Sequence, residues 1–141
     1  MIVNDPHTLT EFTAVFQAYE TALMDNDVAA LDGFFWQSPL VLRFGIGENL
    51  YGFDAITGFR LARRGGSPRR RLSHVVLVTY GRDLATANVE FIREGEARIG
   101  RQSQTWVRMP PGWRVVAAHV SLMDSLPDIA NGKGATPAGP G

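Results

Sequence analysis

The chain contains no cysteine, which excludes disulfide bonds, thiolate metal sites and a cysteine nucleophile. Lysine is almost absent as well, because Lys133 is the single lysine among fourteen basic residues and the others are arginine. Fourteen acidic residues cancel that charge to zero. A neutral domain has no overall electrostatic attraction for nucleic acid or for an anionic membrane, so we expect neither as a partner.

Long apolar runs are also missing, and Met1–Pro6 lacks the basic-then-apolar pattern of a signal peptide, so we expect a cytoplasmic protein. The length of 141 residues suits one domain, which we place at residues 1–125. Residues 126–141 are rich in Gly, Pro and Ala, and we expect a disordered tail there. The chain has no Gly-x-Ser-x-Gly motif and no phosphate-binding glycine loop, and its three histidines lack metal-ligand spacing. We expect no metal and no cofactor.

The first elements are predicted to be helical. Thr8 and Glu11 fit the Ser/Thr-x-x-Glu capping box, after which apolar residues recur at helical spacing to about Met24. Asp27 is predicted to cap a second, short helix that ends near Phe35.

The remainder is predicted to be mostly strand. Leu40–Ile46 is apolar apart from Arg43, and glycines around Glu48–Tyr51 indicate a hairpin before a third helix, Asp54–Arg64. Four strands are expected to follow: Leu72–Tyr80, Leu84–Arg93, Arg98–Arg108 and Trp113–Leu122. This order predicts an α+β fold in which a curved antiparallel sheet wraps the long N-terminal helix as a cone. The mouth of such a cone is a natural small-molecule pocket.

The last two strands carry polar side chains at positions that could face the core. Strict alternation puts Gln102 and Gln104 on one face with Trp106, and puts His119 on one face with Trp113. If these faces are the inner ones, the polar groups line the pocket, although a single bulge would invert them. A lone histidine is more often structural than catalytic, and the sheet could also form a dimer interface.

Two other residues have both a structural and a functional interpretation. Tyr19 lies on the apolar side of the first helix, where it is either a core residue or a phenol at the base of the cone that handles a proton or water. Arg43 interrupts an apolar strand, and a buried guanidinium needs an acceptor. That acceptor is either an internal carboxylate, Glu48 or Glu90, or the carboxylate of a substrate.

The other arginines are interpreted more simply. Arg60 follows Phe59 on the third helix and could point to the cone mouth. Arg63 and Arg64 are expected on a solvated helix face, and Arg69–Arg71 in a solvated loop.

Several motifs in one order resemble the AtzH-like family of the nuclear-transport-factor-like (SnoaL-like) α+β cone superfamily. The resemblance covers about residues 7–124. It is carried by Tyr19–Leu23, Arg43–Gly45, Gly47–Gly52, Phe59-Arg60, Gly81–Asp83, Gly100–Trp106 and Ala117–Ser121.

The resemblance implies a small bacterial protein associated with amidase-signature hydrolases, in the breakdown of cyanuric acid, oxalurate and related nitrogen-rich compounds. It also implies that Tyr19 and Arg43 take part in amidase-type turnover of a dicarboxyurea. The Ser-Ser-Lys machinery of the amidase-signature enzymes themselves has no counterpart here, because the only lysine lies in the tail.

The sequence therefore supports a hydrolase, or its accessory, that acts on a carboxylated urea or amide. Arg43 without an internal counter-ion would hold the carboxylate, with Arg60, and Gln102, Gln104, Trp106 or His119 would contact the substrate. The alternative is a non-catalytic binding or scaffold subunit that forms a homodimer or docks an amidase-signature hydrolase. A third possibility is an isomerase or dehydratase, for which His119 is the only candidate.

Overall fold

The computed structural model describes residues 1–124 and confirms the α+β fold. The expected tail lies outside the described residues. Three helices, α1 (Pro6–Met24), α2 (Val28–Phe34) and α3 (Phe53–Ala62), accompany one mixed sheet. Its strands are β1 (Leu42–Phe44), β2 (Asn49–Tyr51), β3 (Arg70–Tyr80), β4 (Leu84–Arg93), β5 (Ile99–Met109) and β6 (Gly112–Met123). Within the described part of the chain, no helix combines the length and apolarity that crossing a bilayer requires.

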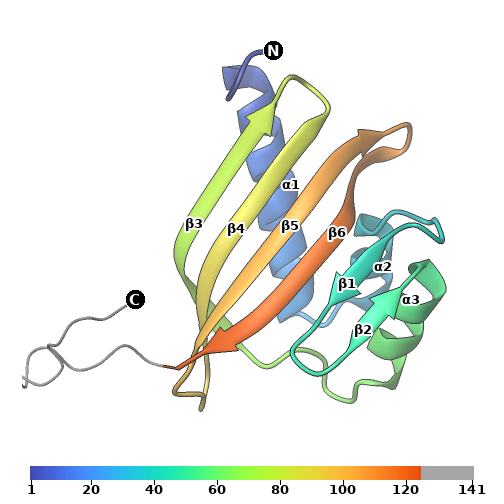
Figure 1. Ribbon diagram of the computed structural model, residues 1–141, viewed down its shortest axis with the longest axis vertical. Helices are drawn as coiled ribbons and strands as arrows, with labels where there is room; N and C mark the ends of the chain where they lie inside the picture. Colours follow the sequence, from blue (N-terminus) through green and yellow to red (C-terminus); the bar gives the residue numbers. More distant parts are fainter. Residues whose placement is uncertain (125–141) are drawn as a thin grey trace, which may run out of the picture.

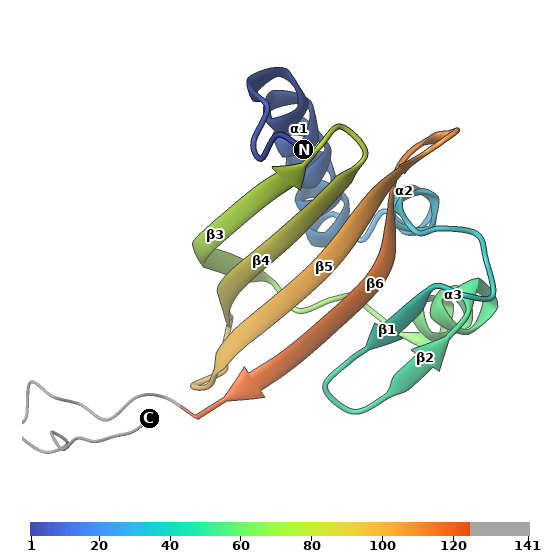
Figure 2. The same ribbon diagram turned by 45° about the horizontal axis from the view of Figure 1, so that its top comes forward.

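The sheet is an antiparallel meander with an added hairpin. Its strand order is β2-β1-β6-β5-β4-β3, and β1 joins the edge of the meander by pairing parallel to β6. Sequence reasoning did not foresee this parallel contact. The long strands curve, and α1 crosses one face of the sheet behind β3, β4 and β5 (Figure 1). Helices α2 and α3 lie at the β1–β2 end, as the rotated view shows (Figure 2).

The helix starts agree only partly with the sequence prediction. The side chain of Asp5, not that of Thr8, caps α1, because Asp5 Oδ2 accepts a hydrogen bond from the Thr8 amide at 3.1 Å. The capping-box prediction was therefore wrong, and Glu11 is free for another role. Asp27 caps α2 as predicted, with Oδ1 accepting from the Ala30 amide at 3.1 Å.

A β-bulge in β6 decides which side chains face the core. Thr105 pairs with Ala117, whereas Trp106 pairs with Val115, so Val116 is an extra residue. The prediction that His119 shares a face with Trp113 was wrong for this reason. Trp113 is buried beneath α1, and His119 is exposed on the opposite face of the sheet.

Aromatic rings join α1 to the inner face of the sheet. Phe12 packs edge-on against Trp106, with ring centroids 5.5 Å apart, and lies 5.2 Å from Trp113. Tyr19, two turns further along α1, meets the same Trp106 ring at 5.7 Å. Such contacts favour edge-to-face geometry and add to the burial of these large side chains, so they fix the position of Tyr19 relative to the sheet.

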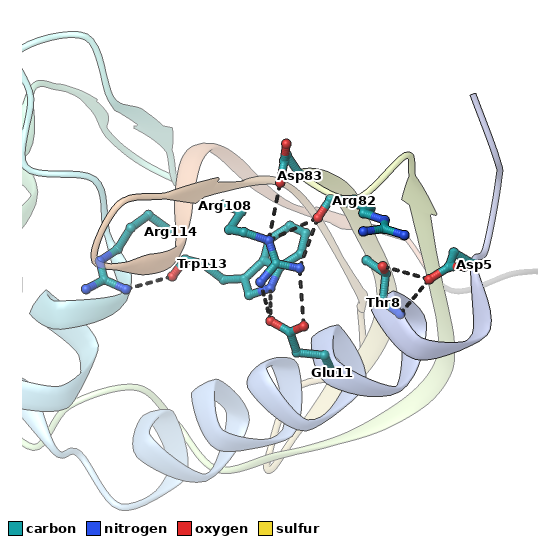
Figure 3. Close-up of polar contacts among 8 residues, drawn as sticks. All are labelled: Asp5, Thr8, Glu11, Arg82, Asp83, Arg108, Trp113 and Arg114. Atoms are coloured by element: carbon teal, nitrogen blue, oxygen red, sulfur yellow. Dashed lines mark hydrogen bonds and ion pairs between the residues drawn. The ribbon is translucent and has the colours of Figure 1, made fainter.

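An ion-pair cluster joins the N-terminal half of α1 to the β5–β6 turn (Figure 3). Both carboxylate oxygens of Glu11 accept hydrogen bonds from the Arg108 guanidinium. Trp113 Nε1 also donates to Glu11 at 3.0 Å, and Arg108 reaches Asp83 at 3.3 Å. The pKa of the Glu11 carboxyl lies below its usual value, chiefly because Arg108 and then Trp113 donate to it. The cluster holds the N-terminal half of α1, away from Tyr19.

We predict that Glu11→Gln lowers the free energy of unfolding by about 1 kcal/mol at pH 7, the size expected for a partly exposed, two-pronged ion pair. Because the folded-state pKa of Glu11 is lowered, its contribution is complete above the unfolded pKa of about 4.3 and is lost as the pH falls through the folded value. Urea unfolding should therefore show a difference between variant and wild type that shrinks below about pH 4.

The matched control is Glu90→Gln, because Glu90 is exposed and its side chain makes no ion pair among residues 1–124. This variant should unfold like the wild type. A Glu11→Gln protein as stable as the wild type at pH 7 would mean that the cluster contributes nothing.

Candidate functional site

A pocket lies at the cone mouth. It is enclosed by the C-terminal half of α1, strand β1, helix α3 and the loop after α3. Its polar lining includes Tyr19, Arg43, Arg60 and Arg63. Three predicted site residues, Tyr19, Arg43 and Arg60, are thus brought together. The pocket measures about 40 Å³. That is room for a water molecule or two, so a larger ligand requires the long arginine side chains to move.

Tyr19 combines a buried ring with an open hydroxyl. The residue is 5% exposed, and its ring contacts Phe34 and Phe35 in addition to Trp106. Its hydroxyl makes no hydrogen bond within residues 1–124 and is not among the buried unpaired atoms. The ring therefore belongs to the core, while the phenol remains available to a ligand or water in the pocket.

Arg43 has a counter-ion inside the chain. Its Nη1 lies 3.1 Å from Glu48 Oε2, across the β1–β2 turn. Glycine at position 45 makes this possible, because a Cβ there would come within 1.7 Å of the Glu48 carboxylate. The prediction of an Arg43 without an internal counter-ion was therefore wrong, and the Glu48 alternative is the one observed. Arg43 still lines the pocket, with its guanidinium carbon 5.6 Å from the centre of the Phe59 ring.

Arg60 is also paired internally. It donates to Asp32 on α2, and its guanidinium carbon lies 5.0 Å from the centre of the Phe35 ring. The position at the cone mouth matches the sequence prediction, but much of the charge is already compensated.

Among the arginines that line the pocket in the described part of the chain, Arg63 has no counter-ion there. Its guanidinium lies 5.0 Å from the centre of the same Phe59 ring that Arg43 contacts, and it forms no ion pair within residues 1–124. Its pKa is lowered, first by burial and then by the charge of Arg43. An anion beside it would offset both costs. The expectation that Arg63 lies on a solvated helix face was wrong, because Arg63 follows the last residue of α3 in an extended conformation and lines the pocket.

The predicted strand residues are not in this pocket. Gln102, Gln104 and Trp106 do face inward, but Gln104 Oε1 accepts from Trp106 Nε1 at 3.0 Å deep in the core. Gln102 Oε1 accepts instead from Arg70 at 3.2 Å. His119 lies on the outer face against Phe44, with ring centroids 5.8 Å apart. None of these four residues lines the Tyr19 pocket.

The sequence did not predict that two further arginines, Arg70 and Arg93, lie on the inner face of the sheet. Arg70, expected in a solvated loop, is the first residue of β3, and its side chain is only 3% exposed. It binds both carboxylate oxygens of Glu20, at 2.7 and 3.0 Å. Arg93 is the residue paired with Arg70 across β3 and β4. Its alternation with the buried Val89 and Phe91 was the sequence signal that could have revealed it.

Comparisons with known proteins agree on the family and the fold. The AtzH-like family model matches residues 1–126. A solved protein of unknown function from Pectobacterium atrosepticum is 54% identical, with 86% of this chain and 95% of that chain covered and a TM-score of 0.84. A cystatin-like fold protein from Burkholderia xenovorans is 41% identical, with 89% and 98% covered and a TM-score of 0.85.

More distant structures share the fold alone. A putative ketosteroid isomerase from Parabacteroides distasonis is 13% identical, with 80% of this chain and 88% of that chain covered and a TM-score of 0.66. A search among curated proteins found no significant match. These structures show the fold, and in this chain the fold carries a pocket at the cone mouth. The match over residues 1–126 establishes that this chain belongs to the AtzH-like family.

Proposed function

We propose that this protein binds a small carboxylated urea or amide at the cone mouth and acts on it as an amidase-type hydrolase. The observation that carries the proposal is the Arg63 guanidinium, partly buried and without a counter-ion in the described chain, in the same pocket as the free Tyr19 hydroxyl. The family resemblance supplies the substrate class, and the charge of the pocket supports it.

The positive charge around the pocket exceeds the negative charge. Glu48 compensates Arg43 and Asp32 compensates Arg60, which leaves Arg63 to attract an anion. A guanidinium binds a carboxylate through two parallel hydrogen bonds, and this contact is stronger where water is partly excluded. Arg63 is therefore the proposed carboxylate-binding residue, and Arg43, held by Glu48, is proposed to orient the rest of the ligand.

The proposed chemistry uses the Tyr19 hydroxyl. A water molecule adds to the carbonyl carbon of the urea or amide, the C–N bond breaks, and the departing nitrogen takes up a proton. In the proposal, the Tyr19 hydroxyl orients the water or relays that proton. The neighbouring arginines stabilise the negative charge that develops on the carbonyl oxygen.

A non-catalytic binding subunit is the second candidate. It is favoured by the Arg43–Glu48 ion pair and by the small pocket, because both leave Arg43 less available for chemistry than the resemblance implies. In this case the outer face of the sheet, which carries His119 and Phe44, is proposed to contact a second copy or an amidase-signature hydrolase. Turnover by the purified protein alone supports the enzyme. Capture of a purified amidase-signature hydrolase without intrinsic turnover supports the subunit.

We predict that Arg63→Gln weakens the binding of oxalurate, a urea that bears a carboxylate, by about tenfold or more, because one partner of a partly desolvated charge pair is lost. Isothermal titration calorimetry measures the change. Arg64→Gln is the matched control, since Arg64 is exposed on the next position and does not line the pocket.

The uncharged analogue biuret should bind the wild type and Arg63→Gln equally. Equal affinity of Arg63→Gln and Arg64→Gln for oxalurate would remove Arg63 from the site.

We predict that Tyr19→Phe retains oxalurate affinity within about twofold and reduces the turnover number by about a hundredfold, the usual contribution of a positioned acid or base. The phenylalanine ring preserves the contacts with Trp106 and Phe34, so the fold should survive. Consumption of oxalurate under saturating conditions, followed by chromatography, separates turnover from binding. A variant that turns over like the wild type would show that the hydroxyl plays no chemical part.

A further inference from the structure

Arg93, the last residue of β4, is a second cation that has no counter-ion among residues 1–124. It ends β4 on the inner face, and its guanidinium carbon lies 5.5 Å from the centre of the Phe91 ring. Its Nε is buried and has no hydrogen-bond partner among the described residues. Within residues 1–124 it forms no ion pair. A charged donor in this condition is costly unless an acceptor comes from outside the described chain.

The carboxylates of this region already have partners. Glu96, whose charge acts on Arg93, accepts two hydrogen bonds from the Arg98 guanidinium. Arg70, the cross-strand neighbour of Arg93, binds both oxygens of Glu20 and also donates to Gln102. Gln102 is 4% exposed, and its Nε2 is a buried donor that also lacks a partner. Among the described residues, two unpaired buried donors thus belong to neighbours of Arg70, and both require an acceptor.

Electrostatics and space both suit an anion beside Arg93. The pKa of Arg93 is lowered by burial and then by the charge of Arg70, and Arg93 in turn contributes to the lowered pKa of Arg63. A pocket of about 280 Å³ lies at this place, between the start of β3 and the end of β4. Its lining includes Arg69, Arg70, Arg71 and Arg93 against a single carboxylate, Glu94. This volume is several times that of the Tyr19 pocket.

We propose that Arg93 is the centre of a second oxyanion site, which binds a carboxylate, sulfate or phosphate group through its guanidinium where β3 begins and β4 ends. The oxyanion is either a separate ion or a second acidic group on the ligand that Arg63 holds. The site does not require hydrolysis by this chain, so it stands apart from the function proposed above.

The first experiment titrates the protein with sodium sulfate at constant ionic strength and follows the Arg93 Nε–H signal by NMR. We expect a saturable shift of this signal. The backbone amides around Ile92 and Glu94 should shift in parallel, and in Arg93→Gln their apparent affinity for sulfate should fall at least tenfold. Arg101→Gln is the matched control, because Arg101 lies on the outer face and bonds Ser121 at 3.1 Å.

Arg63→Gln should retain the sulfate-induced shift at Arg93, which separates this site from the Tyr19 pocket. If Arg63→Gln loses oxalurate binding but keeps the Arg93 shift, both proposals stand. If the Arg93 signal does not saturate, or if Arg93→Gln binds sulfate like the wild type, the second site is refuted whatever happens to oxalurate.

A second experiment asks whether the oxyanion is a separate ion or part of a larger ligand. It compares the affinities of the variants for acetate, which has one carboxylate, and succinate, which has two. Strongly non-additive effects of Arg63→Gln and Arg93→Gln on succinate affinity support one ligand that bridges both arginines. Additive effects support a separate ion at Arg93.

Discussion

The constraint on which the rest of the site depends is the concentration of guanidinium groups at the open end of the cone. Arg43, Arg60 and Arg70 are each held by one carboxylate, from Glu48, Asp32 and Glu20. Arg63 and Arg93 share the same neighbourhood without a counter-ion in the described chain. Like charges that are partly shielded from water destabilise one another. An anion bound at the mouth would offset this repulsion, and the neutral overall charge of the chain conceals the local excess.

The scaffold explains how that excess is maintained. Trp106 fixes Tyr19 and Phe12 against the inner face, and the Glu11 cluster secures the opposite end of α1. Glycine is used where a side chain would displace a functional group. A Cβ at Gly45 would strike Glu48, and one at Gly100 would come within 2.2 Å of the Phe91 ring. Arginine guanidinium groups lie over the rings of Phe59 and Phe91. These cation–π contacts compensate part of the hydration that the guanidinium groups lose on burial.

Much of this architecture could be predicted from local patterns, and the failures have physical causes. The hairpin at β1–β2 and the strand β4 follow directly from glycine placement and alternation. The parallel pairing of β1 with β6 could not be foreseen, because it is a tertiary contact between segments far apart in the chain. The face of the sheet on which His119 lies is set by one bulged residue, Val116, and the periodicity of the sequence does not reveal a bulge. Arg63 and Arg70 sit at the ends of elements, where periodicity gives the least information on side-chain direction.

The most direct test of the account is a crystal structure of the full chain soaked with oxalurate. The account predicts the oxalurate carboxylate within hydrogen-bond distance of the Arg63 guanidinium, with the Arg43–Glu48 ion pair intact and the Tyr19 hydroxyl facing the urea group. Oxalurate bound on the outer face of the sheet beside His119, with Arg63 unoccupied, would contradict it.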